Sequence, residues 1–108
     1  MTFKEIKNTG IKRLERNGSR DMEIIWEIKE TKEKFRLFIH SESYDIQSYA
    51  KLSKWNDKDG WNMITSVNPH TDYNCNIAYS NQYRYTAFDP IIKDMKKIAK
   101  SFISNETN

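Results

Sequence analysis

The sequence predicts an α+β domain: a helix at the N-terminus, a four- to five-stranded antiparallel meander, and a C-terminal helix packed on one face of the sheet. Three observations lead to this class. Apolar residues alternate with a period of two through the middle of the chain, turn residues separate these segments, and the C-terminal part has a helical period. With 108 residues, of which 37% are hydrophobic, the chain fits a single domain, residues 1–108, with one core.

The N-terminal segment has two features of a helix. Thr2 and Glu5 have the spacing of a capping box, in which each side chain accepts a hydrogen bond from a backbone N–H at a helix start. One broad helical stripe holds the apolar residues Phe3, Ile6, Ile11 and Leu14. The Asn17-Gly18 pair favours a left-handed helix end, although it also suits the turn of a short hairpin. We therefore expect a helix over residues 1–16, with a strand as the alternative.

Period-two alternation predicts the strands of the meander. The predicted strands cover residues 22–29, 34–41, 46–55 and 61–67. Residues 31–33 and 56–60 are polar and are expected to form turns, with Gly60 at a position that favours a positive φ. Pro69 ends the last strand, because proline lacks the N–H donor that a central strand requires.

The Asp89-Pro90 pair predicts the start of the C-terminal helix. The residue before a proline avoids the helical region, as an N-cap must, and Pro90 has its φ preset for the first helical position. The helix is expected to run to about Ser104, with residues 105–108 as a frayed polar end. Its predicted apolar stripe consists of Ile91, Ile92, Met95, Ile98, Ala99, Phe102 and Ile103.

The sheet is expected to have apolar side chains on both faces. The predicted helix-facing residues are Trp26, Leu37, Leu52 and Met63. The opposite face then presents Ile25, Phe38, Tyr49, Trp55 and Ile64. Because such a patch is rarely left bare, we expect residues 69–88, a second copy of the chain or another partner to cover it. Phe38, Tyr49 and Trp55 are therefore candidate partner-binding residues.

A second candidate surface is the tyrosine-rich segment of residues 72–85. Tyrosine, asparagine, serine and arginine are typical of adaptable contact surfaces, because they combine rigid area with polar groups. The candidate partner-binding residues are Tyr73, Tyr79, Tyr83, Arg84 and Tyr85. The alternative is a fifth strand from Tyr83 to Phe88 whose aromatic side chains cover the sheet.

The charge pattern allows contact with phosphates. The net charge is +3, and basic residues concentrate near the N-terminus and on the polar face of the predicted C-terminal helix. The candidate phosphate contacts are Lys93, Lys96, Lys97 and Lys100. A solvated helix face is the alternative for these lysines.

Catalytic and cofactor signatures are missing from the sequence. Cys75 is the single cysteine, which excludes an intramolecular disulfide and a cysteine-rich zinc site. His70, Asp72 and Cys75 form one short cluster, whereas zinc sites usually draw three or four ligands from two separated clusters. Three scattered glycines do not make a phosphate-binding loop. We expect no metal, no cofactor and no catalytic residue, with a small hydrolase or nuclease that uses His40 or His70 as the third alternative.

These observations favour a small, non-enzymatic, cytoplasmic binding protein. No apolar run approaches the roughly 18 residues of a membrane span, and the N-terminus lacks a secretory apolar region. The frequent Lys, Asn, Ile and Tyr indicate an AT-rich coding genome, so we expect a phage or mobile-element accessory protein. It would regulate or inhibit a host protein or a protein–nucleic-acid complex, as an anti-CRISPR protein does. Binding of nucleic acid by a basic and aromatic sheet face is the alternative, and the open face would also allow a homodimer.

Overall fold

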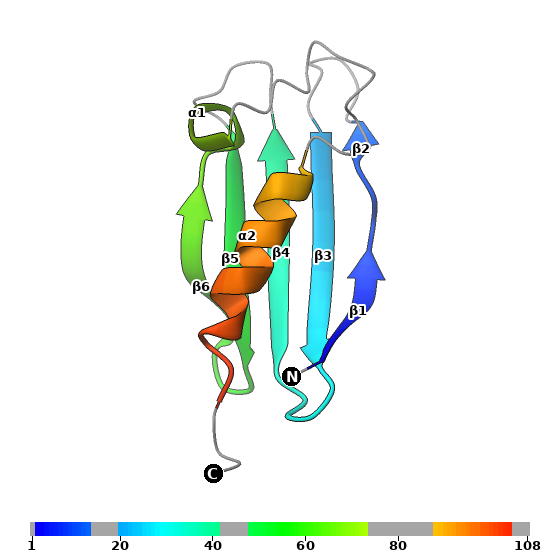
Figure 1. Ribbon diagram of the computed structural model, residues 1–108, viewed down its shortest axis with the longest axis vertical. Helices are drawn as coiled ribbons and strands as arrows, with labels where there is room; N and C mark the ends of the chain where they lie inside the picture. Colours follow the sequence, from blue (N-terminus) through cyan, green and yellow to red (C-terminus); the bar gives the residue numbers. More distant parts are fainter. Residues whose placement is uncertain (1, 14–19, 42–47, 74–87, 105–108) are drawn as a thin grey trace.

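The computed structural model describes residues 2–13, 20–41, 48–73 and 88–104, which form an antiparallel sheet crossed on one face by a helix (Figure 1). Along the chain the elements are β1 (Phe3–Asn8), β2 (Lys12–Arg13), β3 (Arg20–Ile28), β4 (Lys34–Ser41), β5 (Tyr49–Asn56), β6 (Gly60–Val67), α1 (Pro69–Tyr73) and α2 (Asp89–Lys100). The strand order is β1-β3-β4-β5-β6, and β2 also pairs with β3. The predicted α+β class, the antiparallel meander and the C-terminal helix are confirmed.

The three central strands, β3, β4 and β5, contribute the sheet side of the hydrophobic core. In β3 and β4 every second side chain is buried along the whole strand, as the period-two pattern predicts. Leu37 of β4 lies opposite Ile24 of β3 and Leu52 of β5, and none of the three is more than 1% exposed. Antiparallel pairing thus lines up the apolar rows of neighbouring strands into one continuous surface.

Helix α2 covers this surface and runs diagonally across β4 and its neighbours (Figure 1). Ile91, Met95 and Ala99 are fully buried, because residues four apart lie on the same side of a helix. The core that the sheet and helix share contains Met22, Ile24, Trp26, Ile28, Phe35, Leu37, Ile39, Ala50, Leu52, Phe88, Ile91, Met95 and Ala99.

The predicted N-terminal helix is wrong, because this segment forms β1 and β2 along the outer edge of β3. The side chain of Thr2 does not cap a helix. Instead, its Oγ1 donates to Glu30 Oε2 at 2.9 Å, and its backbone N–H donates to Glu30 Oε1 at 2.7 Å. A carboxylate distant in sequence therefore takes the role expected of Glu5, and pairing with β3 satisfies backbone groups that a helix would have satisfied locally.

The supposed helical stripe of this segment is not a core face. Phe3 packs against Trp26 with a centroid distance of 5.9 Å, but Ile6 is the extra residue of a bulge in β1 and is 44% exposed. Gly10, with φ of +66°, turns the chain between β1 and β2. Leu14 lies outside the described residues.

A bulge between β5 and β6 reverses two predicted orientations. The register changes between Leu52 and Ser53, so that Leu52 lies opposite Thr65 and Ser53 lies opposite Met63, with Ile64 as the extra residue. Met63, predicted to face the helix, is 61% exposed, whereas Ile64, predicted to face away, packs against the core. A single inserted residue exchanges the faces of the residues beside it.

Helix α2 also ends earlier than predicted, at Lys100 instead of about Ser104. The backbone N–H of Ser101 donates to the carbonyl of Ile98, and that of Phe102 donates to Ala99, so the last turn tightens. Phe102 consequently leaves the apolar stripe and is 46% exposed. The N-cap is Phe88 rather than the predicted Asp89, which is the first residue of the helix.

Two further predicted strands reach beyond the described residues. Strand β5 begins at Tyr49, and the start predicted for it at residue 46 lies outside the described residues. The alternative fifth strand from Tyr83 also lies outside the described residues, up to residue 87. No helix in the described part of the chain is long and apolar enough to cross a membrane.

Candidate functional site

The face of the sheet opposite α2, called here the open face, has no helix on it in the described part of the chain. Short helix α1 belongs to the α2 side: His70 contacts Ser41, which continues the buried row of β4, and the Tyr73 hydroxyl donates to Asp94 of α2 at 2.7 Å. Side chains of the open face therefore come from alternate positions of the strands themselves.

Phe38 of β4 and Tyr49, the first residue of β5, lie together on this face. Their ring centroids are 6.1 Å apart, and the His40 ring lies 5.4 Å from Tyr49. Two cations lie over these rings: Arg36 Cζ is 5.2 Å from the Phe38 centroid, and Lys51 Nζ is 4.5 Å from the Tyr49 centroid. The cluster is half-buried, held by neighbouring strands, and presents rigid aromatic area edged by positive charge.

A second apolar group lies toward the turn between β5 and β6. Trp55 and Trp61 pair directly across the two strands, with their rings T-shaped and 5.3 Å apart. The Trp55 indole N–H donates to Asp57 at 2.9 Å, and 42% of Trp55 is exposed. Met63 continues the same side of β6, so large apolar surface remains in contact with solvent here.

Opposite charges are paired on the part of the open face formed by β1, β3 and β4. Glu23 forms ion pairs with Lys7 and Arg36, and Asp21 Oδ1 lies at hydrogen-bond distance, 2.5 Å, from His40 Nδ1. The hydrogen bond from Lys7 lowers the pKa of Glu23 most; burial acts in the opposite direction, and Arg36 lowers the pKa further. Glu23 therefore stays ionised and offsets the charge of Arg36.

The open face carries carboxylates as well as basic side chains. Strand β3 contributes the carboxylates of Asp21, Glu23 and Glu27 to it, whereas Lys54 lies on the other side of the sheet. There Lys54 Nζ pairs with Glu33 at 2.6 Å and donates to the Phe102 carbonyl at 2.8 Å. Arg36 is thus paired with a carboxylate, and Lys54 does not contribute its charge to this face.

The structure brings together three of the eight predicted partner-binding residues: Phe38, Tyr49 and Trp55 share the open face. Tyr73 lies apart, at the end of α1. The predicted contacts Tyr79, Tyr83, Arg84 and Tyr85 lie outside the described residues. Trp61 and Met63 were missed. Trp61 directly follows the turn and lies opposite Trp55. Pairing the residues on either side of the predicted turn would have identified this contact from the sequence.

The histidines do not meet in one site. His40 lies on the open face, whereas the Nε2 of His70 lies 3.0 Å from the hydroxyl of Ser41, which is fully buried. Asp72 accepts a hydrogen bond from the backbone N–H of Asn68 at 2.7 Å and so helps to cap the start of α1. Within the described ranges, no group of three His, Cys, Asp or Glu side chains could hold a metal ion, and Cys75 lies outside these ranges.

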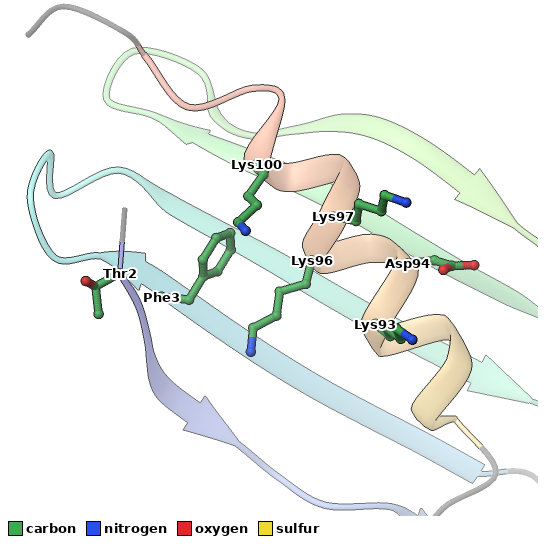
Figure 2. A pocket seen from close by; sticks show the side chains of 7 residues that line it. All are labelled: Thr2, Phe3, Lys93, Asp94, Lys96, Lys97 and Lys100. Atoms are coloured by element: carbon green, nitrogen blue, oxygen red, sulfur yellow. The ribbon is translucent and has the colours of Figure 1, made fainter.

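The four candidate phosphate contacts also share one location. Lys93, Lys96, Lys97 and Lys100 line a groove of about 710 Å³ together with Thr2, Phe3 and Asp94 (Figure 2). This groove lies between α2 and the start of β1, on the face of the sheet opposite the open face.

Comparison with known proteins finds no matching family model, no similar curated protein and no similar solved structure. Function is therefore inferred from the surfaces that the fold builds.

Proposed function

We propose that this chain is a small binding protein that docks on another protein through the open face and acts by occupying the partner's surface. The observation that supports this proposal is the exposed aromatic and apolar surface of Phe38, Tyr49, Trp55, Trp61 and Met63 on a face that no described helix covers.

The residue types of this surface are those of protein interface cores. Aromatic residues, methionine and arginine are enriched there, and lysine and glutamate are depleted. Trp55 and Met63 are the most exposed large side chains of the group, at 42% and 61%. Because neighbouring strands hold the rings, little conformational freedom is lost when a partner covers them.

Nucleic acid fits the open face less well than a protein does. Single-strand platforms combine aromatic rings with a positively charged groove. Here Glu23 pairs with Arg36, and Asp21 pairs with His40, so carboxylates lie beside the cluster where phosphates would pass. A protein partner can meet paired charges of both signs at the rim of an interface.

A finer version of this proposal is an accessory protein of a phage or mobile element that regulates or inhibits a host protein, for example a defence-system inhibitor such as an anti-CRISPR protein. Its support is the Lys-, Asn-, Ile- and Tyr-rich composition together with the small size of the chain. The docking surface itself does not depend on this finer version.

The experiment compares quantitative affinity capture from host cells by three forms of the protein after nuclease treatment. The intact chain and Ile6→Ala, which truncates an exposed apolar residue of β1, should retain the same protein prey. Trp55→Ala combined with Met63→Ala should lose that prey by about 30-fold or more, since the loss of even one interface hot spot costs about 2 kcal/mol or more.

Two outcomes would contradict the proposal. Capture of the same prey by the Trp55 and Met63 variant would show that the open face is not the contact surface. A homodimer in analytical ultracentrifugation that dissociates in this variant, with no other prey lost, would make a second copy of the chain the occupant.

A further inference from the structure

The groove between α2 and β1 is a second surface, separate from the open face. Thr2 and Phe3 form one wall, and α2 forms the other. Figure 2 shows Lys96 and Lys100 extending toward Phe3, while Lys97 extends away from it. The helix and the first strand, which are far apart in the sequence, thus place the Lys96 ammonium group 5.8 Å from the centroid of the Phe3 ring.

The positive charge of this groove is not neutralised within the described part of the chain. Lys93, Lys96, Lys97 and Lys100 are all exposed, and none forms an ion pair there. Asp94 is the one carboxylate among the lining residues, and it accepts a hydrogen bond from the Tyr73 hydroxyl. By contrast, Lys7, Arg36 and Lys54 each pair with a glutamate.

The spacing of the lysines suits a linear array of negative charges. Residues four apart on a helix are separated by about 6 Å along its axis, and Lys93 and Lys100 by about 10 Å. Interaction with the helix dipole accounts for cations in the last turn, but Lys93 lies in the first half of α2.

Phe3 adds a feature that a solvated lysine face does not need. Its ring is half-buried, packs T-shaped against Trp26, and has Lys96 Nζ at 5.8 Å from its centroid. An aromatic ring fixed by the core, with an ammonium group beside it, is the combination that single-strand binders use to stack a base beside neutralised phosphates.

From this juxtaposition we propose that the groove binds a single-stranded nucleic acid, with Phe3 stacking on a base and the α2 lysines contacting the phosphates. This site goes beyond the proposed protein-docking function and lies on the other face of the sheet. A chain with both surfaces would fit a partner that is itself a protein–nucleic-acid complex.

The first test measures binding of a fluorescein-labelled oligothymidylate by fluorescence anisotropy over a series of salt concentrations. Four phosphate contacts predict a slope of log K against log salt of about −3, at about −0.7 per contact. Lys96→Gln combined with Lys100→Gln should flatten this slope to about −1.5 and weaken binding at low salt by about tenfold or more. The matched control, Lys12→Gln with Lys58→Gln, removes the same charge from exposed positions elsewhere and should leave the slope unchanged.

The second test separates base stacking from charge. Phe3→Leu keeps an apolar contact for Trp26 and should weaken oligothymidylate binding by about fivefold or more at constant slope, as loss of a stacked base does. Thermal melting establishes that each variant is folded. If the intact protein does not bind the oligonucleotide at low salt, if both lysine pairs have equal effects, or if polyglutamate of equal charge competes equally well, the proposal is wrong. Each of these outcomes leaves the docking test on the open face unaffected.

Discussion

The two faces of the sheet come from the same strands but have opposite chemistry. On the α2 side, β4 contributes Phe35, Leu37 and Ile39, all fully buried and without polar atoms. On the open side, the residues between them are Arg36, Phe38 and His40, all half-buried and each engaged with a charged or aromatic neighbour. The covered face therefore stabilises the fold, whereas in the described part of the chain no helix packs on the open face.

The energetic difference follows from what each face removes from water. Full burial of a leucine or phenylalanine side chain contributes about 1.5–3 kcal/mol. Ion pairs near the surface contribute about 0–1 kcal/mol, because solvent screens them and the side chains lose freedom. Substitutions on neighbouring residues of one strand should consequently separate stability from binding.

The largest expected effect is that of Leu37→Ala, which opens a cavity where β3, β4 and β5 meet beneath α2. We expect the free energy of unfolding to fall by about 2–5 kcal/mol. The matched substitution Phe38→Ala, one residue along on the open face, should cost about 1 kcal/mol or less. Urea denaturation of both variants measures the difference, and equal losses would mean that the open face also belongs to the core.

An intermediate effect is expected for Glu33, which ties the end of the α2 segment to the sheet. Its carboxylate accepts hydrogen bonds from the backbone N–H of Ser104 at 3.0 Å and from its hydroxyl at 3.1 Å, and it pairs with Lys54. Burial raises the pKa of Glu33, but the hydrogen bonds from Lys54, Thr31 and Ser104 together lower it more, so the pKa lies below its ordinary value of 4.5.

Because the folded-state pKa is lowered, this stabilisation is present above pH 4.5 and is lost as the pH falls through the folded-state pKa. Glu33→Gln should reduce the free energy of unfolding by about 1.5–3 kcal/mol at pH 7, since hydrogen bonds to charged groups contribute about this much. At acidic pH the two proteins should converge. A constant difference between pH 7 and pH 3 would show that the charge of Glu33 is not what stabilises this contact.

The central strands and α2 could be predicted from the sequence because their signals are local. Burial of every second residue follows directly from the alternation in β3 and β4. The turn after β5 follows from Asn56, whose Oδ1 accepts the backbone N–H of Lys58 at 2.8 Å, and from Gly60, whose φ is +78°. In these places the local preference and the tertiary contacts favour the same conformation.

The N-terminal strand and the register of β6 could not be predicted, because each depends on a partner distant in sequence. Thr2 and Glu5 have a helix-start pattern, but Glu30 binds Thr2 and the open edge of β3 takes the backbone. Likewise, Ile64 and Met63 exchange faces only because of a bulge opposite β5. Because the bulge was not predicted, Met63 was assigned to the helix-facing side of the sheet and not to the open face.

The candidate sites show the same division. Period-two alternation places Phe38, Tyr49 and Trp55 on one face, and the helical period places the α2 lysines on one stripe. The groove, however, also needs Phe3, which reaches the lysines only when the N-terminal segment is a strand. The sequence therefore predicts which face of its own helix or strand a surface residue occupies. It does not predict which other helix or strand lies beside that face.

The smallest expected effect is that of Met63→Lys, and it tests the bulge that defines the edge of the open face. Met63 is 61% exposed, so a lysine at this position should keep its charge in water and change the free energy of unfolding by no more than about 0.5 kcal/mol. Ile64→Lys, its immediate neighbour, has to move an ammonium group away from the core that Ile64 contacts, and should cost at least about 1 kcal/mol more. If β6 instead followed the uninterrupted alternation, Met63 would point into the core and the order of the two losses would reverse. Denaturant melts of the two single variants thus decide which register the strand has in solution, and with it whether Met63 belongs to the docking surface.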